Sequence, residues 1–253
     1  MKAILVRVGV DHVYGHWNAP ADPASRHFVY CPIPDSTRQA AGSGRGKYYR
    51  AGCRRDYAPY YVAFEQFLRE YAPAGMKLPH FPLHLLDCCP HVDPDFEYLT
   101  FGDNGERRGS GLKGLRRGDL LVFYAGLRSL IEGQRLIYAL IGLYVVDKVT
   151  LARSVPATLH DHNAHTRWTR ISKKDIIVWA DPRHSGRLLR YILIGEWRDR
   201  AYRVRRDILK AWGGLSVKGG YIQRSGVPPR FLDPERFCKW FQRQGAQLVK
   251  QNN

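Results

Sequence analysis

Short apolar runs, rich in β-branched and aromatic residues, alternate with irregular polar segments along this chain of 253 residues. Such runs are typical of strands that are buried in a sheet. They cover residues 2–10, 118–126, 135–146, 175–180 and 191–194. Gly142 lies inside one run and indicates a bulge or the close approach of another backbone segment. Because residues 127–134 join two neighbouring runs, we expect these two strands to pair antiparallel.

Three other segments have the features of helices. Residues 59–71 carry Tyr61, Phe64, Phe67 and Leu68 at helical spacing, and Pro73 follows as a stop. Residues 202–212 indicate a basic helix that Gly213 and Gly214 close. Asp233 and Pro234 are a typical helix start, with Asp as the cap and Pro at the first helical position. The apolar face of this last helix would hold Phe237, Trp240 and Phe241.

These elements predict a mixed α/β protein of the α+β type. We expect one domain over residues 1–253, with a curved, mostly antiparallel sheet flanked by helices and long basic loops. Residues 104–118 are basic and rich in glycine and indicate a hairpin. Residues 11–58 show little periodicity, and a long irregular stretch in a compact domain is more often a binding surface than a spacer.

The charge of the chain indicates its partner. The formal net charge is +17, and 29 of the 40 basic residues are Arg. The planar guanidinium group binds phosphates in pairs of hydrogen bonds and stacks on bases, so nucleic acid is the expected partner rather than a membrane. No apolar run approaches the 18 or so residues of a membrane span, and Arg7 interrupts the first run before it reaches signal-peptide length. Five cysteines without a repeated spacing fit a reducing compartment, so we expect a cytoplasmic protein.

Basic residues gather in three clusters, each of which could be either a nucleic-acid contact or an ordinary solvated face. The first cluster is interleaved with Tyr48, Tyr49, Tyr57 and Tyr60, which suits phosphates together with stacked bases. Its basic members are Arg45, Lys47, Arg50, Arg54 and Arg55. The second cluster includes Arg107, Arg108, Lys113, Arg116 and Arg117, and the third begins with Arg183 and Arg187 and continues to Arg206.

Two carboxylates are candidates for catalysis. Asp11 follows the first strand, and Asp103 begins the basic glycine-rich segment. Cleavage of an N-glycosidic bond generates positive charge on the sugar, which a carboxylate can stabilise. The alternatives are a turn cap for Asp11, and an Asx-turn or an ion pair with Arg107 or Arg108 for Asp103.

Histidines are concentrated in two places. Residues 160–165 contain three imidazoles at His160, His162 and His165, but no paired spacing completes a set of metal ligands. Asn163 and His165 could instead read or protonate the edge of a base, or the loop could be capped by its own polar groups. Residues 84–91 form a second patch with Cys88 and Cys89, which we interpret as packed thiols. We therefore expect no metal, and the absence of phosphate-loop and dinucleotide motifs predicts no cofactor.

The order of several short motifs resembles the nucleotide-modification-associated domain 3 family. These motifs are residues 1–2 and 9–11, 32–34, 93–95, 101–103, 118–127 and 163–165. The resemblance implies a link to phage and bacterial systems that make, read or attack hypermodified DNA bases. The positions that it carries over are Asp11, Asp103, Asn163 and His165. Residues 115–150 are also similar to the strand pair that forms a base pocket in PUA-like readers.

The resemblance and the residues together lead to one main hypothesis. It is an anti-phage DNA glycosylase that flips a hypermodified base, such as glucosylated hydroxymethylcytosine, and excises it to leave an abasic site. Asp11 or Asp103 would be the catalytic carboxylate, and Asn163, His165, Tyr14 and Tyr124 would recognise the base. The partner would be phage DNA with modified bases, with no membrane and no obligate protein partner. The alternatives are a reader without chemistry and an RNA-binding or RNA-modifying protein.

Overall fold

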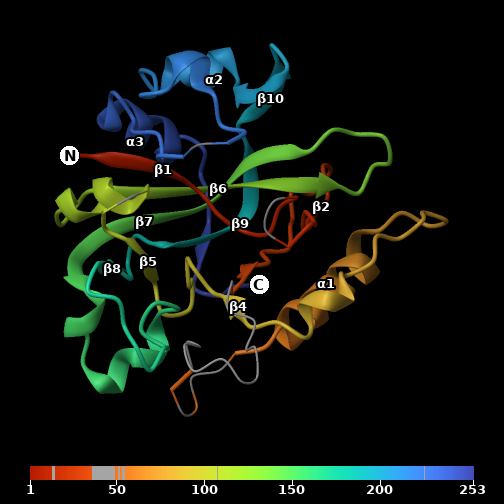
Figure 1. Cartoon of the computed structure of the whole chain (residues 1–253). Coiled ribbons are helices and arrows are strands. Elements are labelled where there is room, and N and C mark those ends of the chain that lie inside the picture. Colours follow the sequence, from red (N-terminus) through yellow and green to blue (C-terminus); the bar gives the residue numbers. More distant parts are fainter. Residues whose placement is uncertain (13–14, 36–48, 51, 53–54, 107, 225) are drawn as a thin grey trace.

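A mixed sheet of eight strands forms the centre of the molecule (Figure 1). The computed structural model describes residues 1–253 except 13–14, 36–48, 51, 53–54, 107 and 225. The main path of the sheet runs β1 (Ala3–Arg7), β6 (Leu120–Ser129), β7 (Ile137–Leu151), β8 (Asp175–Ala180) and β5 (Thr100–Asn104). Strand β2 (Pro20–Ala21) joins β6, β9 (Gly186–Leu193) joins β7, and β12 (Leu248–Val249) joins β9. Only β1 and β2 run parallel to their neighbour β6, so the expected α+β class with a mostly antiparallel sheet is confirmed.

The longest strand pair, β6 with β7, is antiparallel as predicted. Its register shifts between Phe123 and Tyr124, opposite the part of β7 that contains Gly142. A Cβ atom on Gly142 would lie 2.5 Å from the ring of Phe96. The same atom would lie 3.1 Å from the backbone oxygen of Gly186, so both alternatives expected at this glycine occur, a neighbouring bulge and the close approach of another backbone segment.

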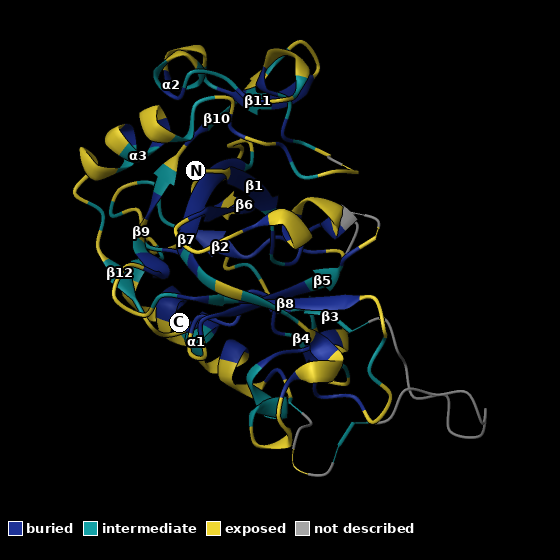
Figure 2. Ribbon diagram, turned by 90° about the vertical axis from the view of Figure 1, so that its left-hand side faces the viewer, coloured by how far each residue is buried: buried dark blue, intermediate teal, exposed yellow. Residues whose placement is uncertain are grey.

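Both faces of the sheet are buried, which explains why its central strands are continuous apolar runs. Ile4 and Val6 of β1 face one core, which also contains Phe64 of helix α1 (Ala58–Tyr71). Ala3 and Leu5 face the other core, together with helices α2 (Arg206–Ala211) and α3 (Pro234–Gln242). Figure 2 shows the central strands as buried and the helices with one exposed side. The molecule is thus a sheet between two helical layers.

Helices α1 and α3 begin close to where the sequence predicts. Phe64, Phe67 and Leu68 of α1 are buried as predicted, but Tyr60 is buried in place of Tyr61, which is exposed. Helix α3 confirms its predicted start, because the Asp233 side chain accepts a hydrogen bond from the Arg236 backbone N–H at 3.0 Å.

One predicted element is wrong, and another is confirmed only over its second half. The expected hairpin at 104–118 is instead a 3₁₀ helix, η2 (Arg108–Gly114), which follows β5. Leu112 and Leu115, three residues apart, both enter the core, and this spacing suits a tight helical turn. The expected helix at 202–212 begins as strand β11 (Ala201–Val204), because Tyr202 and Val204 alternate into the core with a period of two. Strand β11 pairs with β10 (Gly195–Arg198), and α2 follows it.

The remaining described elements are short. Strand β3 (Ile33–Pro34) pairs with β4 (Pro90–His91). Four more 3₁₀ helices complete the chain: η1 (Leu83–Leu85), η3 (Ala152–Ser154), η4 (Ala157–His162) and η5 (Lys218–Gly220). No helix within the described ranges combines the length and the apolar character needed to cross a membrane.

Candidate active site

A cavity of about 500 Å³ lies where β1, β5 and the segment after β4 meet. Its polar wall contains Arg7, Asp11, His91, Asp93, Asp103, His165 and Arg224, and its apolar wall includes Leu5, Val8, Phe101 and Tyr124. This volume falls in the range of about 300–1,000 Å³ that is usual for ligand sites. The apolar wall with a few convergent charged groups is also typical of such sites.

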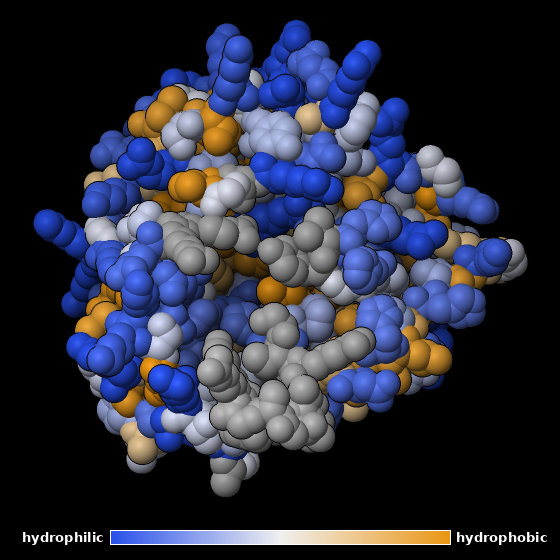
Figure 3. Space-filling view, in the orientation of Figure 1, coloured by the Kyte–Doolittle hydropathy of each residue, from blue (hydrophilic) through white to orange (hydrophobic). Residues whose placement is uncertain are grey.

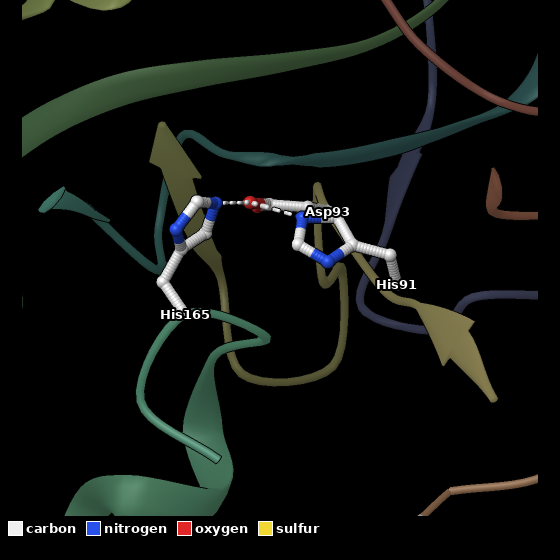
Figure 4. A group of neighbouring side chains, drawn as sticks. All are labelled: His91, Asp93 and His165. Atoms are coloured by element: carbon white, nitrogen blue, oxygen red, sulfur yellow. Dashed lines mark ion pairs between the residues drawn. The ribbon is translucent and has the colours of Figure 1, made fainter. Parts of the chain in front are cut away.

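Two histidines converge on one buried aspartate in this cavity (Figure 4). The Nε2 atom of His165 lies 3.5 Å from Oδ2 of Asp93, and the Nε2 atom of His91 lies 3.7 Å from the same oxygen. The two imidazole rings meet edge to face with their centroids 5.0 Å apart. One carboxylate and two imidazole nitrogens therefore point at a common small volume.

Backbone and side-chain donors hold the Asp93 carboxylate in place. Its two oxygens accept the Gly102 N–H at 2.8 and 2.9 Å, and Oδ1 faces the Asn163 amide nitrogen at 3.4 Å. Only 3% of the side chain is exposed. Burial raises the pKa of Asp93 to about 8, whereas the neighbouring His165 and the Gly102 N–H act in the opposite direction. The charged form of this carboxylate thus depends on positive groups near it.

Each histidine has a second carboxylate behind it. The Nδ1 atom of His165 lies 2.8 Å from Oδ2 of Asp175, the first residue of β8. The Nδ1 atom of His91 lies 3.5 Å from Oδ2 of Asp35, and this oxygen also accepts the Tyr49 hydroxyl at 3.1 Å. Such carboxylates fix the tautomer and the orientation of an imidazole.

The sheet positions this cluster through the pairing of β5 with β8. Gly102 on β5 lies opposite Ile177 of β8, and Asn104 lies opposite Asp175. Gly102, which binds Asp93, and Asp175, which contacts His165, therefore lie on neighbouring strands at one edge of the sheet. Asn163 completes the link between the strand and the histidine. Its amide nitrogen donates to Oγ1 of Thr100 at 3.1 Å, and its oxygen accepts the His165 backbone N–H at 2.9 Å.

Three residues that the sequence singled out for catalysis or base contact line the same cavity. Asp11 forms an ion pair with Arg7 at 2.9 Å, and Asp103 accepts the backbone N–H of Asn104 at 2.6 Å. His165 is the third, as described above. Tyr124, predicted to contact the base, is also part of the wall, but its hydroxyl donates to the Ile222 carbonyl.

The other predicted base contacts have different positions. Asn163 is 1% exposed and its amide bonds internally, so its position favours a role in holding His165 rather than in reading a base. Tyr14 lies outside the described residues.

The predicted phosphate contacts are distributed over several places. Arg45, Lys47, Arg54 and Arg107 lie outside the described residues, as does the side chain of Arg108. Arg55 forms an ion pair with Asp161, and exposed Arg183 lies 3.6 Å from Asp181. Arg50 donates its backbone N–H to the Arg167 carbonyl. Figure 3 shows hydrophilic side chains projecting along the upper edge of this view, over α2 and β10.

Arg187 differs from the other arginines because it is buried. Its guanidinium group donates to the Gln251 carbonyl at 3.0 Å and lies over the ring of Phe28. Burial lowers the pKa of Arg187 to about 10. This geometry favours a structural role, although the residue also borders a second cavity.

That second cavity is larger, about 760 Å³, and lies beside α1. Two of its charged residues, Arg167 and Asp95, form a buried ion pair at 3.0 Å. The smaller cavity is the better candidate for chemistry, because it alone of the two contains the imidazole and carboxylate cluster.

Asp93, Asp35 and Asp175 were not predicted as site residues. His91 belongs to the patch interpreted above as packed thiols, yet Cys88 and Cys89 are only half-buried. One signal was available: His91 and Asp93 are two residues apart, so in an extended segment they share a side. The pairing of that segment with residues 163–165 depends on tertiary structure and leaves no local pattern.

The cluster can support two kinds of chemistry. His91, Asp93 and His165 have ligand atoms within 4.8 Å of one another and could hold a metal ion. Without an ion, the same groups could transfer protons at the wall of the cavity.

Comparison with known protein families finds a match to nucleotide modification associated domain 3 over residues 2–203. This segment includes the whole His91, Asp93 and His165 cluster together with Asp11 and Asp103. No match was found among curated proteins, and none was found among solved structures. Because the match spans well over half of the chain, the protein belongs to the nucleotide modification associated domain 3 family, and its role is associated with nucleotide modification.

Proposed function

We propose that the 500 Å³ cavity receives a modified base everted from DNA and that the protein hydrolyses the N-glycosidic bond of that nucleotide. In this reaction the C1′–N bond breaks and a water oxygen bonds to C1′. The electron pair of the broken bond and a proton go to the base. The products are a free base and an abasic site.

The observation that carries this proposal is the contrast between the chain and its cavity. The protein has a net charge of +17, yet the cavity wall holds three aspartates, Asp11, Asp93 and Asp103. The positive exterior attracts a polyanion, and carboxylates inside stabilise the positive charge that develops on the sugar. The same wall also holds Arg7 and Arg224, so acidic and basic groups lie side by side in the cavity.

Asp11 and Asp103 are the carboxylates that the proposal assigns to the sugar. Asp103 lies beside Asp93, whose pKa it helps to raise, so the two groups share one region of the wall. Asp11 is held by Arg7, which fixes its direction. Arg7 and Arg224 supply the positive charge within reach of a flanking phosphate.

The test uses purified full-length protein and two DNA samples of the same sequence, one with glucosylated hydroxymethylcytosine and one with cytosine. We expect alkali-labile breaks in the modified DNA alone. D11N or D103N should reduce the breaks, and D181N is the matched control, because Asp181 pairs with His184 outside the cavity.

Two results would contradict the proposal. Retention of modified DNA without breaks would identify a reader of modified bases that performs no chemistry. Binding to RNA with the same affinity, regardless of base modification, would identify an RNA-binding protein. Both outcomes would leave the family assignment unchanged.

A further inference from the structure

From the geometry of the cluster we infer that His91, Asp93 and His165 bind one divalent transition-metal ion at the wall of the cavity. The two histidines supply Nε2 atoms, and Asp93 supplies Oδ2. All three ligand atoms lie within 4.8 Å of one another. Ligands at about 2.0–2.2 Å from a tetrahedral zinc ion are separated by roughly 3.3–3.5 Å, close to the Asp93 distances seen here.

The distances within the cluster favour an ion over direct hydrogen bonds. The Nε2 to Oδ2 distances are 3.5 Å for His165 and 3.7 Å for His91, beyond the usual limit of about 3.2 Å for an N–H···O bond. The groups therefore face one another without a direct hydrogen bond. A cation between the three groups accounts for their convergence and for the 3.5 and 3.7 Å that separate the histidine nitrogens from the Asp93 oxygen.

The carboxylates behind the histidines strengthen this inference. Asp175 lies 2.8 Å from Nδ1 of His165, and Asp35 lies 3.5 Å from Nδ1 of His91. The Asp175 contact places a proton on Nδ1 of His165, so the lone pair of its Nε2 points toward the Asp93 oxygen. Neutral imidazole nitrogens and a carboxylate that face one another are groups that can hold a cation between them.

The surroundings of Asp93 also fit a metal ligand. Its carboxylate is 3% exposed and is held by the Gly102 N–H. Buried carboxylates occur where they are paired or where they coordinate a metal. No Lys or Arg side chain forms a salt bridge with Asp93 among the interactions that the structure describes, where its charged partners are His91 and His165.

The set of ligands indicates what kind of site this is. Three protein ligands beside an open cavity are typical of catalytic metal sites, which keep a position for water or substrate. Two imidazoles and one carboxylate suit zinc, iron(II) or manganese(II) rather than calcium. An ion here would supply a Lewis acid and would lower the pKa of a coordinated water. That role rests on the proposed function, but binding of the ion does not.

Binding can be measured without any assay of activity. Full-length protein freed of metal by a chelator is titrated calorimetrically with Zn²⁺, Co²⁺ and Mn²⁺, and the visible spectrum of the Co²⁺ form is recorded. We expect one ion per chain, and a higher melting temperature when it is bound. H91A and H165A each remove a ligand and should weaken metal binding by roughly 100-fold or more. D175N removes only a carboxylate that contacts a ligand, so the expected loss of affinity is about 10- to 100-fold.

The matched control is H184A, because His184 is an exposed histidine outside the cavity. It should bind the ion as tightly as the unchanged protein. Unfolding curves in the chelator check that each variant is folded. D175N retains all three ligands and gives a second measure if H165A fails to fold.

Two outcomes would overturn the inference: no stoichiometric binding of any of the three ions, or binding that H91A and H165A leave unchanged. Failure of the proposed function looks different. One ion bound through these histidines without release of a base would refute the glycosylase and leave the metal site standing. Base release by protein that binds no ion would refute the metal site and support the glycosylase.

Discussion

A Cβ atom on Gly102 would lie 2.5 Å from Cδ2 of His165, so the backbone of β5 and this imidazole are in direct contact. The same atom would lie 2.7 Å from Oδ1 of Asn163. A side chain at position 102 therefore requires His165, Asn163 or the backbone of β5 to move.

The first prediction concerns this contact. G102A should cost about 1–3 kcal/mol of folding stability through overpacking, and it should weaken metal binding by displacing His165. Urea unfolding and calorimetric titration measure the two effects. G111A is the control, because its Cβ would meet only the side chain of Ile4, at an ordinary 3.5 Å. Unchanged metal binding in G102A would mean that His165 is not held against Gly102.

The second prediction concerns Asn163, which joins Thr100, Asp93 and His165 from a buried position. N163A leaves buried polar groups without partners and should cost about 1–3 kcal/mol of unfolding free energy. T158A, at an exposed position in η4, should change stability by less than about 0.5 kcal/mol. Equal stability of the two variants in urea would refute the anchoring role.

The third prediction concerns the buried ion pair of Arg167 with Asp95. The Arg167 guanidinium group also donates to the Asp161 carbonyl at 2.9 and 3.0 Å, and the residue is 2% exposed. R167A leaves Asp95 buried without its cation, so we expect a loss of about 3–5 kcal/mol. Chemical denaturation provides the measurement, with R170A on the neighbouring exposed surface as control. A loss below about 1 kcal/mol would show that the pair contributes little.

The fourth prediction concerns DNA binding. If the +17 charge binds the phosphate backbone, the logarithm of the affinity should fall linearly with the logarithm of salt concentration. R224E, at the cavity wall, should weaken binding more than R69E, an exposed change on α1 that borders neither cavity. Fluorescence anisotropy at several salt concentrations gives both values. Affinity that is insensitive to salt would contradict the proposed DNA contact.

Most of the fold could be predicted because the sheet is buried on both faces. The strands 118–126, 135–146 and 175–180 are continuous apolar runs, and such runs are visible in one sequence. The wrong element at 104–118 and the wrong first part of the helix at 202–212 are short amphipathic segments, in which tertiary contacts of residues such as Leu112 and Tyr202 decide the conformation. Local preference is a weak guide there.

The candidate site could be predicted only in part. Asp11, Asp103 and His165 follow or precede recognisable elements, and they do share a cavity. Asp93 and Asp175 belong to the site because β5 pairs with β8 and because residue 102 has no side chain. These are relationships between distant segments, which no local spacing encodes.

Arg224 borders the cavity, although it lies outside the segment that the family match covers. Residues 226, 228 and 229 also border the cavity, but they lie beyond residue 203, where the family match ends. The family segment thus carries all the acidic and imidazole groups of the cavity, while part of the wall is built by a stretch that the family does not define. If the cavity receives a nucleotide as proposed, exchanging 224–229 should alter which nucleotide is accepted without disturbing the reactive groups, so this short stretch is the place to engineer selectivity.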